Sequence, residues 1–158
     1  MDSPNIILTA KLASIVPSLM LAGYTISRYG YIATIYDERP QISARLFRSS
    51  FRRSGKVAVP LIQFMLLSSS YLAYVVPEKR KLWLLAAAMA MGEFVWTGFV
   101  MFPGIERIEA ISKDEKMQKR SEQTLEHRQL MIKWIKQNFV RTAMATVGGL
   151  AGLWASMA

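Results

Sequence analysis

LWLLAAAMAMGEFVWTGFVMF, residues 82–102, contains no lysine or arginine over a length that can cross a membrane. In a helix, about 20 predominantly apolar residues span the hydrocarbon core of a bilayer. A second stretch of this kind, VAVPLIQFMLLSSSYLAYVV, occupies residues 57–76. A soluble bundle would place charged residues along the outer face of each helix, so these two stretches favour membrane-spanning helices.

Two further apolar segments complete the set, although each contains a charged residue. Residues 6–26 contain Lys11, and residues 134–156 contain Arg141. The first segment has no basic region in front of it, so we expect a retained helix rather than a cleaved signal peptide. The sequence therefore predicts an all-α integral membrane four-helix bundle, with residues 1–158 forming a single membrane domain.

The composition narrows the chemistry that the chain can perform. Of its 158 residues, 52% are hydrophobic and 20% are charged, with one histidine and no cysteine. The lack of cysteine excludes disulfides, thiolate metal sites and thiol catalysis. A single histidine excludes sites that need two, such as the zinc protease motif and the two-histidine iron triad. No glycine-rich phosphate loop is present, so we expect neither a metal nor an organic cofactor.

Positive charge is concentrated on one side of the predicted bundle. The formal net charge is +9, and most lysines and arginines lie in segments 27–56 and 103–133. The positive-inside rule makes these segments cytosolic loops and places both termini in the lumen. Anionic lipid at the cytosolic surface accounts for the charge, so we expect lipid contacts and no nucleic-acid partner. We expect the endoplasmic reticulum or a related endomembrane as the location.

Two parts of these loops are expected to be ordered. Residues 106–128 alternate acidic and basic side chains with spaced apolar ones, which predicts a cytosolic helix or a long extension of the last helix. Residues 42–51 combine Leu46, Phe47 and Phe51 with arginines, which is typical of a helix lying along the membrane surface.

The last predicted helix has one stripe that we expect to point into the bundle. At 100° per residue, its members recur at near-heptad steps along a single face. They are His127, Trp134, Asn138, Arg141, Ala145, Gly148 and Gly152. The first half of the stripe is polar and aromatic, and the second half is small, which allows a neighbouring helix to approach closely.

Charged residues inside a membrane need a partner or a role, and the predicted spans contain Glu93 and Arg141. With a rise of 1.5 Å per residue, they lie roughly 13 and 10 Å below the cytosolic boundary, within about one turn of the same level. Gln63 belongs to this level on the second helix, with Tyr24 and Thr25 near it on the first. All four helices therefore contribute a polar group to one layer.

This layer has two interpretations. It can be a buried ion pair with interhelical hydrogen bonds that only lock the helices together. Alternatively, it can line a pocket for a polar aromatic substrate, with Trp96 and Trp134 as aromatic walls. His127 is the one side chain of the type that suits acid–base chemistry near neutral pH. It lies two turns before Trp134, so it is either a solvated surface residue or a general base at the cytosolic mouth.

The segment WIKQNFVR, residues 134–141, and the small residues after it resemble the W-x-x-x-N-x-x-R ending of the anthrone oxygenase-like family. Its members are small four-helix membrane proteins that were long classed as a domain of unknown function. Three weaker similarities agree in order and spacing. They are Leu21-Ala22-Gly23, Arg53-Ser54-Gly55 with Pro60, and the T-x-x-x-M-x-P pattern of Thr97, Met101 and Pro103. The chain departs from the family at Gly104 and Ile105, where Thr-Asn is usual.

The resemblance implies a cofactor-independent monooxygenase of fungal polyketide secondary metabolism. Such an enzyme converts an anthrone, an aromatic polyketide, to an anthraquinone with O2. The chemistry needs a base, a partner for the oxyanion and a dry pocket. Our hypothesis takes His127 or Glu93 as the base and Arg141 with Asn138 as the oxyanion partners. The expected substrate contacts are Trp134, Trp96, Tyr24, Gln63 and Thr97.

Two other functions stay open at this point. A non-enzymatic membrane adaptor would use the basic loops for lipid or a partner protein. Charge reversal across residues 45–53 would then abolish its function, while Asn138→Ala and Arg141→Met would spare it. A glutathione-dependent membrane transferase shares the length and architecture, but its R-x-x-N-x-x-E pattern is missing from residues 57–76. A bundle this thin is also compatible with a homo-oligomer.

Overall fold

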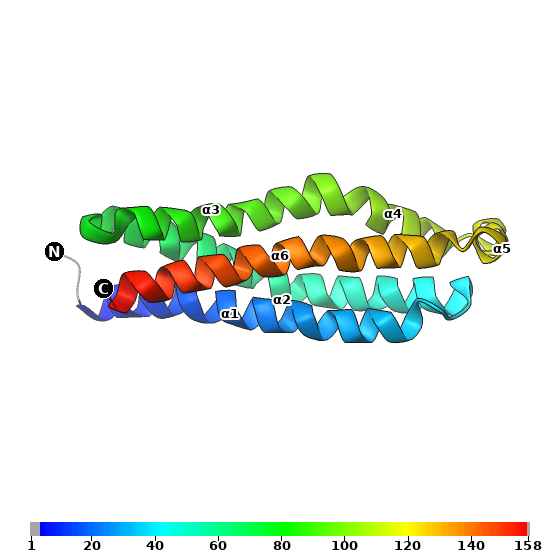
Figure 1. Ribbon diagram of the computed structural model, residues 1–158, viewed down its shortest axis with the longest axis horizontal. Helices are drawn as coiled ribbons and strands as arrows, with labels where there is room; N and C mark the ends of the chain where they lie inside the picture. The colour runs from blue at the N-terminus through cyan, green and yellow to red at the C-terminus, as the bar shows by residue number, and fades with distance from the viewer. Residues whose placement is uncertain (1–3, 158) are drawn as a thin grey trace.

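The computed structural model describes residues 4–157, and nearly all of them are helical. Four long helical rods run back and forth, and the third consists of α3, a π-helical turn and α4 in succession (Figure 1). The elements are α1 Pro4–Ile35, α2 Pro40–Val75, a 3₁₀ turn Pro77–Lys79, α3 Arg80–Trp96, the π turn Thr97–Met101, α4 Phe102–Ile111, α5 Glu115–Thr124 and α6 Glu126–Met157.

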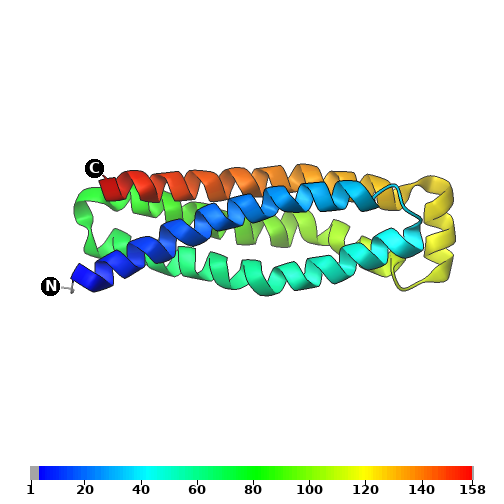
Figure 2. The ribbon, with the colours of Figure 1, turned by 90° about the horizontal axis from the view of Figure 1, so that it is seen from below.

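The long helices form a closed ring around one axis. Helices α1 and α3 each pack against both α2 and α6, so α1 and α3 occupy opposite corners. The start of α1 and the end of α6 lie at one end of the bundle, and α5 covers the other end (Figures 1 and 2). The predicted all-α four-helix bundle is therefore confirmed.

Three of the rods are long and apolar enough to span a membrane. They cover Pro4–Ile35, Pro40–Val75 and Pro77–Ile111, with mean hydropathies of 1.8, 1.5 and 1.6 over their best windows. Helix α6 lies beside them along the bundle (Figure 2). Its buried residues include polar and small ones such as Asn138, Arg141 and Gly148. These features identify an integral membrane bundle, since its outer surface consists largely of exposed Leu, Val, Met and Phe side chains.

The helices are longer than the apolar segments that predict them. Segments 27–56 and 103–133, expected as loops, are mostly helical. The 36 residues of α2 correspond to about 54 Å, against about 30 Å for the hydrocarbon core. Hydropathy detects only the part of a helix that faces lipid. Beyond that part, ion pairs join the helices: Arg52 to Glu109 at 3.2 Å, Arg107 to Glu126 at 2.7 Å and Arg128 to Asp37 at 2.6 Å.

Two local expectations need correction. Residues 42–51 do not lie along the membrane surface but continue the axis of α2, because Ala44 and Phe47 are buried in the apolar core. The helix expected over 106–128 is broken twice. Asp114 starts α5 by accepting hydrogen bonds from the backbone N–H groups of the next turn, and Leu125, with a φ of 56°, separates α5 from α6.

The inward stripe predicted for the last helix is confirmed, because all seven of its residues are buried. Its small residues allow close contact with two neighbours. A Cβ atom on Gly148 would lie 3.2 Å from Met89 of α3, and one on Gly152 would lie 3.0 Å from Ile15 of α1 and 3.1 Å from Trp83 of α3. A larger side chain at Gly152 therefore has no space unless the helices separate.

We predict that Gly152→Leu lowers the free energy of unfolding by about 1 to 3 kcal/mol, because the new side chain must displace Ile15 and the ring of Trp83. Thermal unfolding in detergent, followed by circular dichroism, measures the effect. Gly30→Leu is the matched control, since a Cβ atom at Gly30 meets no atom within 4 Å. Equal stability of the two variants would contradict close packing of α6.

Candidate active site

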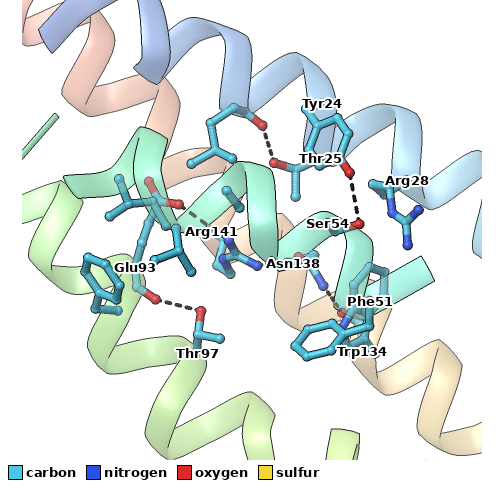
Figure 3. Close-up of a pocket in the computed structure, with 16 residues that line it drawn as sticks. Tyr24, Thr25, Arg28, Phe51, Ser54, Glu93, Thr97, Trp134, Asn138 and Arg141 are labelled. Atoms are coloured by element: carbon cyan, nitrogen blue, oxygen red, sulfur yellow. Dashed lines mark hydrogen bonds and ion pairs between the residues drawn. The ribbon is translucent and has the colours of Figure 1, made fainter. Parts of the chain in front are cut away.

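An internal cavity interrupts the apolar core between two packed layers. One layer, which includes Phe47 and Met101, lies toward α5, and the other, which includes Leu21 and Ile62, lies toward the chain ends. The cavity is lined by α1, α2, α6 and the α3–π segment (Figure 3). Its volume of about 110 Å³ is several times the 10 to 15 Å³ that one water molecule needs on this measure. The bundle thus encloses a space large enough for a ligand group.

Glu93 of α3 and Arg141 of α6 meet in this cavity, which confirms that they share a level. Arg141 Nη2 lies 3.8 Å from Glu93 Oε2, and the two residues are 9% and 1% exposed. Arg141 Nη1 donates to Asn138 Oδ1 at 3.3 Å, and Asn138 Nδ2 donates to the Trp134 carbonyl at 2.9 Å. Asn138 therefore holds the guanidinium in place, while the contact between the two charges stays too long for a hydrogen bond.

Several buried polar atoms around the cavity have no hydrogen-bond partner within residues 4–157. They are both carboxylate oxygens of Glu93, Nε of Arg141, Nε1 of Trp134 and Nε of Arg28. Buried polar groups are almost always paired, and leaving one unpaired costs about 1 to 3 kcal/mol. Acceptors and donors thus surround one space, an arrangement that a bound molecule carrying both kinds of group would satisfy.

The rim of the cavity is polar on the side of α1 and α2. Tyr24 donates to Ser54 at 2.9 Å, and Ser54 donates to the Ser50 carbonyl at 2.8 Å. Thr25 also lines the cavity, but its hydroxyl donates a hydrogen bond to the Leu21 carbonyl of its own helix. The predicted substrate contact Tyr24 is therefore brought to the cavity, where its hydroxyl bridges two helices (Figure 3).

Thr97 also lines the cavity, at the first residue of the π turn. Its hydroxyl donates to the Glu93 carbonyl at 2.7 Å. A π turn inserts an extra residue into a helix, and such turns are frequent at functional sites. Here it rotates the side chains after Thr97, so that Met101 is fully buried while Phe99 points outward. The extra residue of the π turn therefore changes which face of the helix points into the bundle, between the cavity-lining part of α3 and the start of α4.

Two predicted substrate contacts lie outside the cavity. Trp96 is half-buried, and its indole N–H donates to the Gln137 carbonyl at 3.1 Å, which ties α3 to α6. Gln63 is exposed on the outer face of α2, because Ala58 and Ile62 turn inward in its place. Both residues have the expected depth but the wrong angle around their helices.

Of the two interpretations of His127, the solvated surface residue is wrong, because the side chain is buried; it also lies away from the cavity. It is 3% exposed and does not belong to the cavity lining. Its Nδ1 lies 3.1 Å from the Ser121 hydroxyl, and its Nε2 lies 3.1 Å from the Glu38 carbonyl. Because both ring nitrogens are engaged, His127 links α5 and α6 to the turn after α1.

Three of the lining residues that the sequence prediction misses are Arg28, Phe51 and Ser54. All three lie in segment 27–56, where the hydropathy pattern predicts a loop. Helical spacing finds them once the helices are extended, since Arg28 comes one turn after Tyr24 and Ser54 comes one turn before Ala58. No group of three or more His, Asp or Glu side chains within residues 4–157 is arranged to hold a metal ion.

Gly104 and Ile105, where the chain departs from the family pattern, do not line the cavity. Ile105 is 3% exposed and packs in the apolar layer with Phe47 and Trp134. Gly104 lies in α4, beyond the π turn, and a Cβ atom there would meet nothing within 4 Å. The departure therefore changes the packing of the layer toward α5 rather than the composition of the cavity wall.

We predict that His127→Ala lowers the free energy of unfolding by about 1 to 3 kcal/mol, because the Glu38 carbonyl and the Ser121 hydroxyl lose a buried partner. Denaturant unfolding in mixed micelles measures this. His127→Gln, which keeps one hydrogen bond, should lose less stability. If His127→Ala kept its stability but lost enzymatic activity, a catalytic role for His127 would be favoured over a structural one.

Comparison with known families agrees with this geometry. The family model described as Anthrone oxygenase matches residues 47–151, which is more than half of the chain and includes Glu93, Asn138 and Arg141. No curated protein and no solved structure matches the chain. On the extent of the family match, the chain belongs to the anthrone oxygenase family.

Proposed function

We propose that this protein is a cofactor-independent oxygenase that converts an anthrone to an anthraquinone with O2. One observation carries the proposal: a buried carboxylate that accepts no hydrogen bond and buried N–H groups that donate none within residues 4–157 surround the same cavity. Membership of the anthrone oxygenase family supports an oxygenase-like activity in general terms. The specific reaction is inferred from the chemistry that these groups can perform.

The first step is removal of a proton from the central methylene carbon of the anthrone. Glu93 is the base, because its two oxygens accept no hydrogen bond from residues 4–157 and so have free lone pairs. The resulting carbanion is delocalised onto the ketone oxygen, which becomes phenolate-like. Arg141 Nε and Trp134 Nε1 donate to that oxygen, since both lack another acceptor within the described residues. Asn138 positions the Arg141 guanidinium rather than touching substrate itself.

The second step is the reaction of the electron-rich carbanion with O2. One electron passes from the carbanion to O2, and the radical pair combines to form a carbon–oxygen bond. The resulting hydroperoxide loses water, so that one oxygen atom stays in the new carbonyl and the other leaves as water. The balance is anthrone plus O2 giving anthraquinone plus water. The protein's part is to generate the carbanion and exclude competing proton donors from the cavity.

The cavity lining suits a flat aromatic body. Tyr24, Phe51, Phe94 and Trp134 lie around it, and aliphatic side chains such as Leu21 and Ile62 add apolar surface between the polar groups. Thr97 completes the wall beside Glu93. An apolar tricyclic substrate partitions into lipid, so a site enclosed by membrane helices receives it without crossing water.

We further propose that the enzyme acts in fungal polyketide secondary metabolism, in the endoplasmic reticulum or a related membrane. The end of the bundle covered by α5 carries most of the basic residues, which the positive-inside rule makes cytosolic, with both termini lumenal. The cavity then lies beneath the cytosolic surface, and anionic lipid faces the basic end.

Oxygen labelling of purified protein in detergent tests the reaction. With an emodin-type anthrone under ¹⁸O2, catalysed turnover should place one labelled atom in each quinone and should exceed the spontaneous rate. Metal analysis of the same sample should find no stoichiometric metal. Uptake of O2 no faster than in a detergent blank would overturn the proposal. Quinone without label would indicate dehydrogenation instead of oxygen insertion.

We predict that Glu93→Gln and Arg141→Met each lower kcat by about 100-fold or more, because the base or the oxyanion partner is lost. Oxygen uptake by folded variants, matched by circular dichroism, measures this. Glu106→Gln and Arg45→Met remove the same charges from exposed positions outside the cavity and should retain turnover. Full activity of both cavity variants would contradict the catalytic roles of Glu93 and Arg141 and would indicate that the pair is only structural.

A further inference from the structure

A groove on the outer surface between α1 and α2 continues the rim of the cavity. Tyr24, Arg28 and Ser54 line both spaces, so the Tyr24–Ser54 hydrogen bond stands between them. The remaining groove residues are Tyr31, Leu46, Ser49, Ser50 and Arg53. No acidic side chain is among them. The groove therefore carries two arginines and three serines with no carboxylate to neutralise them.

Arg28 differs from the arginines at this end of the bundle that form ion pairs. Arg52, Arg107 and Arg128 each form an ion pair with a carboxylate. Arg28 is half-buried, its Nε is buried without a hydrogen-bond partner, and it forms no ion pair within residues 4–157. A free arginine on an open surface is fully solvated, whereas a half-buried one has lost part of its hydration without compensation.

The geometry of Arg28 leaves its donors available to a ligand. Its Cζ atom lies 5.2 Å from the centre of the Tyr31 ring, so a cation–π contact holds the guanidinium at the groove. No hydrogen bond from the Arg28 guanidinium to an acceptor within residues 4–157 accompanies this contact. A planar guanidinium with free donors matches a carboxylate, which it binds through two parallel hydrogen bonds.

Arg28 lies on the opposite side of the cavity from Glu93 (Figure 3). At the Glu93 side, the carboxylate and the Arg141 guanidinium balance each other. At the Arg28 side, positive charge is unbalanced, and Arg53 adds to it from the groove. A ligand that fills the cavity and reaches the rim would therefore gain most from a negative group at the end away from Glu93.

We propose that Arg28 binds an acidic substituent of the substrate, so that the enzyme prefers anthrones that carry a carboxylate. This inference rests on the proposed function for the identity of the aromatic body. The reacting ring lies in the cavity, with its reacting carbon toward Glu93, and the rest of the molecule extends through the rim between α1 and α2, where it carries the carboxylate. Arg53 attracts the acid into the groove, and Arg28 fixes the orientation of the bound molecule.

Ligand binding tests the proposal without turnover. Anthraquinone-2-carboxylate and its neutral analogue 2-(hydroxymethyl)anthraquinone are titrated calorimetrically into the full-length protein in a neutral detergent. The wild type should bind the acid more tightly than the alcohol. Arg28→Gln should weaken binding of the acid by about tenfold or more and that of the alcohol far less, because a charge-assisted hydrogen bond is lost. Arg28→Lys keeps the positive charge but cannot form two parallel hydrogen bonds, so its affinity for the acid should lie between those of the wild type and Arg28→Gln.

Arg45→Gln is the matched control, since Arg45 is an exposed arginine of α2 outside the groove and should leave both affinities unchanged. An unaltered preference for the acid in Arg28→Gln would overturn the proposal, and so would an equal loss for both compounds. A separate titration with phosphatidylglycerol identifies a lipid site. If Arg28→Gln lost the lipid and kept the acid, the groove would bind lipid headgroups and the proposal would fail. Failure of the wild type to oxidise any anthrone would overturn only the proposed function.

Discussion

The arrangement of this bundle depends on a layer of buried polar side chains. Glu93, Asn138 and Arg141 come from α3 and α6 and are nearly fully buried. Groups of this kind at the surface of a soluble protein are compensated by bulk solvent, but within a membrane their partners are other side chains, backbone groups, a ligand or enclosed water. The two helices that carry the layer must therefore stay in register, and the packing on either side of the layer maintains that register.

Different side chains perform this packing on the two sides. Toward the chain ends, Gly148 and Gly152 let α6 approach α1 and α3, and Ser18 donates across the interface to the Ala145 carbonyl at 2.6 Å. Toward α5, large side chains such as Phe47 and Trp134 meet edge to face with 5.4 Å between ring centres. The cavity lies at the polar layer, where the packing changes from small to large side chains.

Periodicity and composition are enough to predict the spans and the inward stripe, but not the angle of a residue around its helix or the helix boundaries. The stripe on α6 is correct because it depends only on the period of that one helix. Gln63 and Trp96 have the predicted depth, yet depth says nothing about rotation around the axis. Arg28 and Ser54 fall in a predicted loop because hydropathy ends at the lipid boundary, whereas ion pairs extend the helices beyond it. Hydropathy therefore predicts the spans but not the full length of the helices.

The freedom of the Glu93 carboxylate has a local cause. Polar side chains near it direct their hydrogens to backbone groups: Thr97 to the Glu93 carbonyl and Asn138 to the Trp134 carbonyl. Neither donor reaches the carboxylate, and Arg141 Nη2 stays 3.8 Å away because Nη1 is held by Asn138. A layer selected only to join helices would gain stability by closing these gaps, since each unpaired buried group is costly. The carboxylate of Glu93, which has an ion-pair partner but accepts no hydrogen bond within residues 4–157, is therefore better explained by a molecule that enters the cavity than by a structural role alone.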